Sequence, residues 1–352
     1  MRKKSLLIVV IMILLPLAGL FANIISQPAA SVHLIRNKII TVSELNERLA
    51  EYQAEAMASG VTAAITPEEM LDVLINDEVV LQGAERDGFF VTDSQVEQLL
   101  RQQKAYAESQ IGREITQEQF EMVVRSNYGI GLNEFREKLR ETALVDLYVR
   151  GKMSNVIDDW KTPSDNDIND FFRKNRASFM NPELIRLSHI FMPFDTDGMS
   201  KAQVKQEMEK LARWIRYDTY TFEELVPRYS KDPDSRNRGG DIGWLAYDDT
   251  RMRAALGPAF FDEVFTLALG KPSGVLESTT GYHIVKLTIH TEPKLLGIDE
   301  YINPDSSVTV RQYIRQTLET RNQQEAYLTA IDRLVEQLRT SARIEIFYKE
   351  GL

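Results

Sequence analysis

The chain has 352 residues, a formal net charge of −10 at pH 7 and no cysteine. Its length allows two or three domains, each with its own core. The negative charge argues against nucleic acid as a partner, because such proteins contact phosphates through clustered Lys and Arg. Without cysteine, neither disulfides nor thiolate metal sites can hold the fold or carry out chemistry.

The N-terminal region has the pattern of an export segment. Three basic residues at 2–4 precede an uncharged apolar run over residues 6–25. Cleavage after Ala22 would suit a signal peptide, whereas a run of about 20 residues is also long enough to remain as a membrane anchor. Both alternatives place the rest of the chain outside the cytoplasm. We therefore expect a periplasmic or other extracytoplasmic protein, with residues 1–27 as its signal peptide or its anchor in the inner membrane.

The region 32–180 is predicted to be mainly helical. Residues 32–40 are expected to form a pair of strands with a turn around Asn37. Four helix starts follow, each with a capping box, which is a Thr followed three residues later by Glu or Gln: Thr41 with Glu44, Thr66 with Glu69, Thr92 with Gln95, and Thr116 with Gln119. A fifth helix is expected over about 133–153. The apolar stripes of these helices are typical of a core, although shallow apolar faces could also bind polypeptide.

Strands enter the pattern after Pro182, and residues 183–291 are predicted to form a compact α+β domain. The expected strands are 184–192, 241–245 and 281–289, and the expected helices are 200–217, a short one from Thr221, and 258–269. Alternation predicts that Ile185, Leu187, His189 and Phe191 share one face of the first strand, and that His283, Val285, Leu287 and Ile289 share one face of the last.

The segment 307–352 is predicted to contain a long helix and a strand. The helix, over 308–339, has an apolar face that needs cover: Ile314, Leu318, Leu328, Ile331, Leu334 and Leu338. The alternating segment 342–348 could pair with residues 32–40. The two ends of the chain would then form one mainly helical domain, with residues 183–291 inserted between its parts.

Two of the four histidines, His189 and His283, occupy similar places in the middle of apolar strands. Burial disfavours the charged imidazole, so both are expected to be neutral and to need hydrogen-bond partners. Each could bond the other or an acidic neighbour, and Asp232 is the natural acceptor. The alternative is that each histidine only satisfies hydrogen bonds in a core. A metal-dependent hydrolase is disfavoured, because the pair lacks the spacing and the third ligand of such sites.

Three stretches of this region resemble the parvulin class of peptidyl-prolyl isomerases in order and spacing. They are "RLSHIFM" (186–192), "FEELVPRYSKDPDSRNRGGDIGWL" (222–245) and "FFDEVFTLALGKPSGVLESTTGYHIVKL" (260–287). The resemblance implies a four-stranded antiparallel sheet wrapped by helices. It also implies that His189 and His283 lie on central strands with Asp232 as their acidic partner.

The same resemblance assigns the remaining site residues and the activity. It implies that Ile242, Leu256 and Phe260 hold the proline ring and that Ser278 and Thr280 supply hydroxyl groups. No cofactor or metal is implied. Gly239 and Gly240 are expected to let the backbone turn tightly where a side chain would clash.

The residue types suit rotation about an X-Pro bond, whose barrier is about 18–20 kcal/mol because the planar amide has resonance to lose. An apolar, water-poor pocket favours the less polar twisted state. We therefore expect the histidines and Asp232 to form a rigid hydrogen-bonded floor, not a proton-transfer group. The connection at 193–200 contains two aspartates and no arginine cluster. This disfavours selection of phosphoserine-proline and favours a generic unfolded segment with proline.

The flanking segments are similar in layout to exported foldases of the SurA, PrsA and PpiD kind, in which a parvulin domain is embedded in a chaperone body. The first hypothesis is therefore an isomerase and folding factor that acts on unfolded, proline-containing polypeptides outside the cytoplasm. The alternative is a non-catalytic holdase, in which the helical body binds unfolded clients and the parvulin-like domain does not turn over. Contact with a membrane would come only from residues 6–25.

Overall fold

The computed structural model describes residues 27–58 and 65–349, and the predicted signal or anchor at 1–27 lies almost wholly outside them. The chain divides into two compact units. We call Met1–Thr162 with Glu319–Leu352 the terminal unit, and Pro163–Leu318 the central unit. Within the described residues, no helix is long and apolar enough to cross a membrane.

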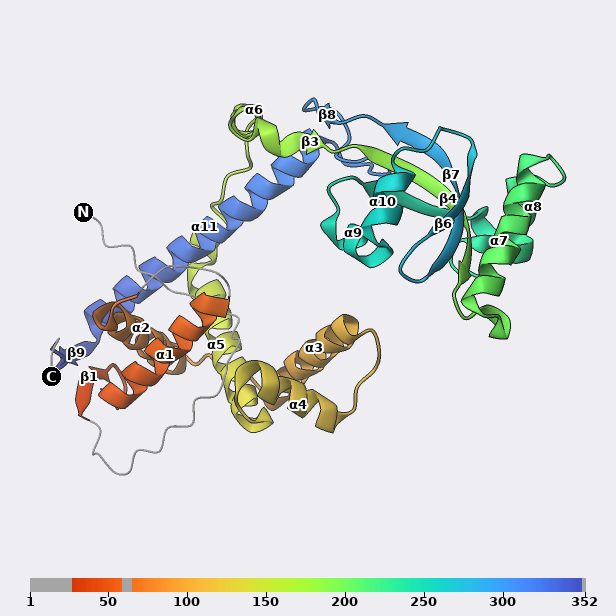
Figure 1. Cartoon of the computed structure of the whole chain (residues 1–352). Helices are drawn as coiled ribbons and strands as arrows, with labels where there is room; N and C mark the ends of the chain where they lie inside the picture. The colour runs from red at the N-terminus through yellow and green to blue at the C-terminus, as the bar shows by residue number, and fades with distance from the viewer. Residues whose placement is uncertain (1–26, 59–64, 350–352) are drawn as a thin grey trace. The chain divides into compact units, whose positions relative to one another are not determined.

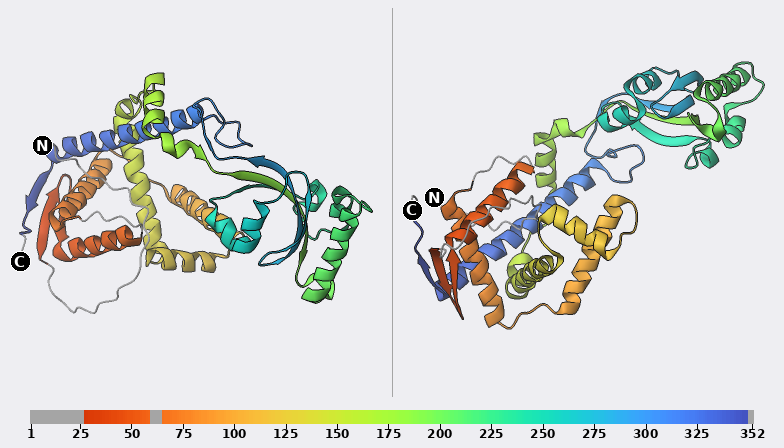
Figure 2. Two further views of the ribbon diagram at one scale, coloured as in Figure 1. Left: turned by 45° about the horizontal axis from the view of Figure 1, so that its top comes forward. Right: turned by 60° about the horizontal axis from the view of Figure 1, so that its bottom comes forward.

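The terminal unit joins both ends of the chain in one small antiparallel sheet. Its strands are β1 (Pro28–His33), β2 (Asn37–Thr41) and β9 (Arg343–Ile346), in the order β2-β1-β9. Val32 of β1 lies opposite Lys38 on one side and Ile344 on the other. The predicted pairing of the C-terminal strand with the N-terminal one is therefore confirmed, and the two strands lie side by side (Figure 2).

The sheet shares one core with α1 (Val42–Ala58), α2 (Pro67–Arg86) and the later parts of α5 (Leu132–Ile157) and α11 (Val310–Ser341). Helices α3 (Asp93–Ile111) and α4 (Gln117–Tyr128) form a second cluster with the first part of α5. All four predicted capping boxes are present, with each Thr hydroxyl accepting from the amide three residues on. One residue of the predicted apolar face of α11 is not buried. Leu328 is 39% exposed, because it lies to one side of the buried stripe formed by Ile331, Leu334 and Leu338.

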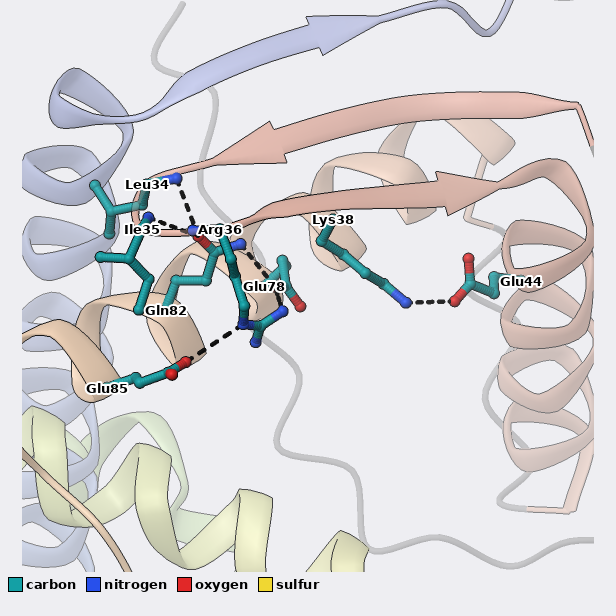
Figure 3. A network of polar contacts seen from close by, with 8 residues as sticks. All are labelled: Leu34, Ile35, Arg36, Lys38, Glu44, Glu78, Gln82 and Glu85. Carbon is teal, nitrogen blue, oxygen red and sulfur yellow. Dashed lines mark hydrogen bonds and ion pairs between the residues drawn. The ribbon is translucent and has the colours of Figure 1, made fainter.

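The turn between β1 and β2 is held by one buried side chain of α2 (Figure 3). Gln82 Oε1 accepts hydrogen bonds from the amides of Leu34, Ile35 and Arg36 at 3.0, 3.0 and 3.3 Å. Gln82 Nε2 donates to Glu78 at 2.8 Å, and Glu78 in turn forms an ion pair with Arg36 at 2.9 Å. The turn therefore spans 34–36, slightly before the predicted Asn37.

The central unit is built on a four-stranded antiparallel sheet. Its strands are β4 (Leu184–Pro193), β5 (Asp241–Ala246), β6 (Pro272–Glu277) and β7 (Gly281–Thr291), in the order β5-β4-β7-β6. Strand β6 was not among the three strands predicted from residue patterns. Its sequence, "PSGVLE", contains Pro and Gly, which weaken a strand signal but are tolerated at the edge of a sheet.

Helices cover both faces of this sheet (Figure 1). On one face, α7 (Lys201–Arg216) and α8 (Phe222–Tyr229) pack against Ile190 and Ile284. On the other, α10 (Pro258–Val264) packs against β4 and β7, and α9 (Thr250–Leu256) precedes it. The predicted helix 258–269 therefore ends earlier, at Val264, and α9 was not predicted. Gly257, with φ +93°, separates the two short helices.

A smaller group of elements completes the central unit. It comprises α6 (Asp165–Lys174), a 3-10 turn at Arg176–Phe179, the strand pair β3 (Met180–Asn181) with β8 (Lys294–Leu295), and the start of α11. Their buried side chains form one cluster: Ile168, Phe179, Leu296, Val310, Ile314 and Leu318. The predicted 183–291 domain lies inside this unit.

Candidate functional site

His189 of β4 and His283 of β7 face each other within the sheet of the central unit. Their Nδ1 atoms are 3.2 Å apart, and the residues are 7% and 3% exposed. Both lie on the face covered by α10, because Ile185, Leu187, Val285 and Leu287 at alternate positions share a cluster with that helix. The predicted shared face is confirmed for these residues, whereas Ile289 is exposed.

Each outer nitrogen of the histidine pair also has a partner. His189 Nε2 lies 3.0 Å from Asp232 Oδ2, and His283 Nε2 lies 2.8 Å from Ser278 Oγ. Thr280 adjoins this end, with its Oγ1 atom 3.3 Å from Ser278 Oγ. The side chains of Asp232, His189, His283 and Ser278 thus form one continuous hydrogen-bonded row.

The electrostatics of the row favour neutral imidazoles. Burial lowers the pKa of His189, although the Asp232 carboxylate counteracts part of this effect. Burial, and then the neighbouring His189, lower the pKa of His283 to about 3. Burial alone would raise the pKa of Asp232, but hydrogen bonds from Ser235, His189 and the Asp234 amide outweigh it and hold that pKa below its usual value.

These charge states fix the direction of every hydrogen bond in the row. The ionised Asp232 can only accept, so His189 Nε2 carries the hydrogen and His189 Nδ1 is left as an acceptor. His283 Nδ1 must then donate to His189 Nδ1, and His283 Nε2 accepts from the Ser278 hydroxyl. Each ring is confined to one neutral tautomer.

Aromatic rings enclose the histidine pair. The Phe260 ring of α10 lies 4.6 Å from the His283 ring, and the Phe191 ring of β4 lies 4.7 Å from it. Phe260 is 3% exposed. Phe191 was predicted on the same face but was not assigned to the site, and its position two residues after His189 was the available signal. The rings exclude water from one side of the imidazoles.

The loop before β5 packs directly on the backbone of His189. Gly239 and Gly240 have φ values of +68° and +78°. The Gly240 carbonyl accepts from the His189 amide at 2.8 Å, and a Cβ atom at Gly240 would lie only 2.4 Å from the His189 carbonyl oxygen. The predicted clash of a side chain is therefore confirmed at Gly240, whereas at Gly239 the space is open and only the backbone conformation favours glycine.

The structure places the other two predicted contact residues less centrally. Leu256, at the end of α9, is partly buried against the cluster that contains Phe260. Ile242 is 40% exposed on the edge strand β5, at a bulge between Asp241 and Gly243. The described residues contain no group of three or more His, Asp or Glu side chains that could hold a metal ion.

Comparisons with known proteins match two regions of the chain. A model of the PPIC-type PPIASE domain matches residues 172–291, and a model of the SurA-like N-terminal domain matches residues 1–148. A protein named Chaperone SurA from Saccharophagus degradans is 27% identical over 260 residues, which cover 73% of this chain and 56% of that protein. A Foldase protein PrsA from Clostridium botulinum is 22% identical over 288 residues, covering 81% of this chain and 74% of that protein.

The chain therefore spans little more than half the length of the SurA protein it matches. A solved structure of the SurA-like chaperones PEB4 and Cj1289 of Campylobacter jejuni aligns with 91% of this chain and 100% of its own, at 18% identity and a TM-score of 0.35. The chain thus joins a SurA-like N-terminal domain to a PPIC-type, that is parvulin-type, isomerase domain that contains the histidine pair.

Proposed function

We propose that this protein is a peptidyl-prolyl cis-trans isomerase and folding factor for exported proteins. The observation that carries the proposal is the buried row Asp232, His189, His283 and Ser278 beside the Phe260 ring. The match of residues 172–291 to the PPIC-type domain supports it. The terminal unit would act as the chaperone body, consistent with the match of residues 1–148 to the SurA-like domain.

The chemistry proposed for the site is rotation without covalent bonding. Twisting the X-Pro amide reduces its charge separation, so a water-poor pocket stabilises the twisted state relative to the planar one. Phe260, with Leu256 and Ile242, would hold the proline ring while the carbonyl side turns. The neutral histidines and Asp232 would keep the floor of the pocket rigid, and the hydroxyls of Ser278 and Thr280 would complete its polar edge.

The proposed substrates are unfolded polypeptides that contain proline, met outside the cytoplasm. The segment 193–200 has no basic residue to bind a phosphate before Lys201, and its Asp197 forms an ion pair with Lys231 at 2.7 Å. These charges favour unphosphorylated segments. The location rests on the export pattern of residues 6–25, which would act as a signal peptide or as an anchor.

The direct test is isomerisation of a proline-containing peptide by the full chain, followed by protease-coupled absorbance. The wild type should raise the rate above background, and Phe260→Ala should lower kcat/KM at least tenfold, since the ring no longer holds the proline. Phe222→Ala is the matched control, because Phe222 is equally buried but packs on the opposite face of the sheet. Circular dichroism would confirm that both variants are folded. No rate above background in the wild type would contradict the proposal.

A second candidate function is a holdase, favoured by the SurA-like match and by exposed apolar side chains on the terminal unit. These side chains are Met57, Phe90, Tyr106 and Met122. Suppression of client aggregation by folded Phe260→Ala, at the level of the wild type, would assign client binding to surfaces other than the isomerase pocket. Suppression together with an inactive wild type would leave the holdase as the function.

A further inference from the structure

Ser235 is a buried serine in the loop before β5 that none of the motifs above assigns to the site. It is 1% exposed, and its hydroxyl donates to Asp232 Oδ2. The same oxygen accepts from His189 Nε2 at 3.0 Å. The second oxygen, Asp232 Oδ1, accepts from the Asp234 amide at 3.2 Å. Donors therefore hold both oxygens of the carboxylate, and the serine shares one of them with the histidine.

The backbone of Ser235 connects the same loop to β4. Its carbonyl accepts from the amides of Arg238 and Gly240 at 2.8 and 2.9 Å, and the Gly240 carbonyl accepts from the His189 amide at 2.8 Å. One residue thus fixes both the carboxylate that His189 faces and the loop that packs on the His189 backbone.

Few other groups near Asp232 influence its protonation state. His189 on β4 faces it directly, and His283 on β7 lies beyond His189. Lys231, the preceding residue, is paired with Asp197 at 2.7 Å. Burial opposes ionisation of Asp232, and the hydroxyl of Ser235 is the strongest of the donors that counteract it.

We propose that Ser235 is a positioning residue of the isomerase site. Its hydroxyl keeps Asp232 ionised and oriented, so that His189 carries its hydrogen on Nε2 and the hydrogen bonds run in one direction as far as Ser278. Ser235 touches neither the substrate nor the reacting bond. The activity part of this inference rests on the proposed isomerase function, whereas the tautomer part does not.

The first experiment compares pH profiles of kcat/KM for the full chain in a protease-free assay, which can reach acid pH. In Ser235→Ala the ionised Asp232 loses one hydrogen bond, so the pKa of its carboxyl should rise. The acid limb of the kcat/KM profile should then move upward by about one pH unit. Ser235→Cys, which keeps the size but donates weakly, should move it by less and covers the case in which the alanine variant does not fold. An acid limb unchanged in Ser235→Ala would overturn the proposal.

Ser230→Ala is the matched control. Ser230 lies in the same loop and is 2% exposed, but its hydroxyl accepts from the Phe191 amide at 3.2 Å and does not contact Asp232. This variant should lose stability with no shift of the acid limb. An equal shift in Ser230→Ala would mean that loosening of the loop, not the bond to Asp232, sets the profile, and would overturn the proposal.

The second experiment is independent of turnover. The ¹⁵N shifts of the His189 ring should identify the Nε2–H tautomer in the wild type, and their acid transition should move upward by about one pH unit in Ser235→Ala. The Nδ1–H tautomer in the wild type, or an unmoved transition in the variant, would overturn the proposal. A wild type without isomerase activity but with the expected shifts would reject the proposed function and leave the positioning role of Ser235 standing.

Discussion

The Nδ1 atoms of His189 and His283 lie 3.2 Å apart with a single hydrogen to share between them. Two neutral rings can satisfy this contact only if one donates and the other accepts. Asp232 accepts from Nε2 on the far side of His189, so Asp232 determines which of the two Nδ1 atoms donates and which accepts. A proton added to His189 would place two N–H donors against each other, and burial disfavours a charge on either ring.

This relationship predicts that the central unit loses stability in mild acid. His283 has a pKa of about 3 when folded and about 6.5 when unfolded, so between these values the unfolded chain binds a proton that the folded chain does not. The free energy of unfolding is therefore unaffected by His283 above pH 6.5, and it decreases as the pH falls from 6.5 towards 3. At pH 5 the loss should be about 2 kcal/mol.

Urea unfolding at pH 7.5 and pH 5 would measure this loss. His283→Gln removes the titrating group and is the control, so its stability should fall less than that of the wild type over the same range. Equal falls in the two proteins would show that His283 does not carry the effect.

The two glycines of the loop offer a matched pair of substitutions. Gly239→Ala should cost about 1 kcal/mol, because only the positive φ is unfavourable and the space around it is open. Gly240→Ala has the same backbone cost and also places a Cβ atom 2.4 Å from the His189 carbonyl oxygen. It should therefore lower the thermal midpoint further and reduce the proposed isomerase activity. Similar midpoints for the two variants would argue against the close packing of the loop on β4.

In the terminal unit, Gln82→Leu should be strongly destabilising. It leaves the three turn amides at 34–36 without their acceptor and removes the hydrogen bond from Gln82 to the buried Glu78, at a cost of about 3 kcal/mol. Glu85→Gln is the comparison, because it weakens only an exposed ion pair with Arg36 and should cost under about 1 kcal/mol. Hydrogen exchange of the turn amides should accelerate in Gln82→Leu alone, and unchanged protection there would contradict the assignment.

Two leucines of α11 should differ in their tolerance to truncation. Leu334→Ala removes a side chain that is 2% exposed in the core of the terminal unit and should cost about 2–4 kcal/mol. Leu328→Ala, at a position that is 39% exposed, should cost under about 1 kcal/mol. Denaturant midpoints of the two variants would measure the difference, and equal costs would show that Leu328 is covered in solution.

The sequence patterns predicted those elements that depend on interactions between residues close together in the chain. The capping boxes depend on contacts between residues three apart, so the starts of α1 to α4 and of α8 could be predicted directly. Alternation likewise predicted which faces of β4 and β7 carry the histidines. The short helix α9 and the edge strand β6 were missed, because they have weak periodicity and are formed by packing on neighbours distant in sequence.

The sequence by itself determined the types of side chain at the site, through the order and spacing of His189, Asp232 and His283. Only the tertiary structure decided that the two rings meet through their Nδ1 atoms, that Phe191 and Phe260 enclose them, and that Ser235 holds the carboxylate. The reason is that hydrogen bonding depends on distances of a few tenths of an ångström between groups up to 94 residues apart. Strand register and loop packing set those distances, and neither can be predicted from the spacing of residues along the chain.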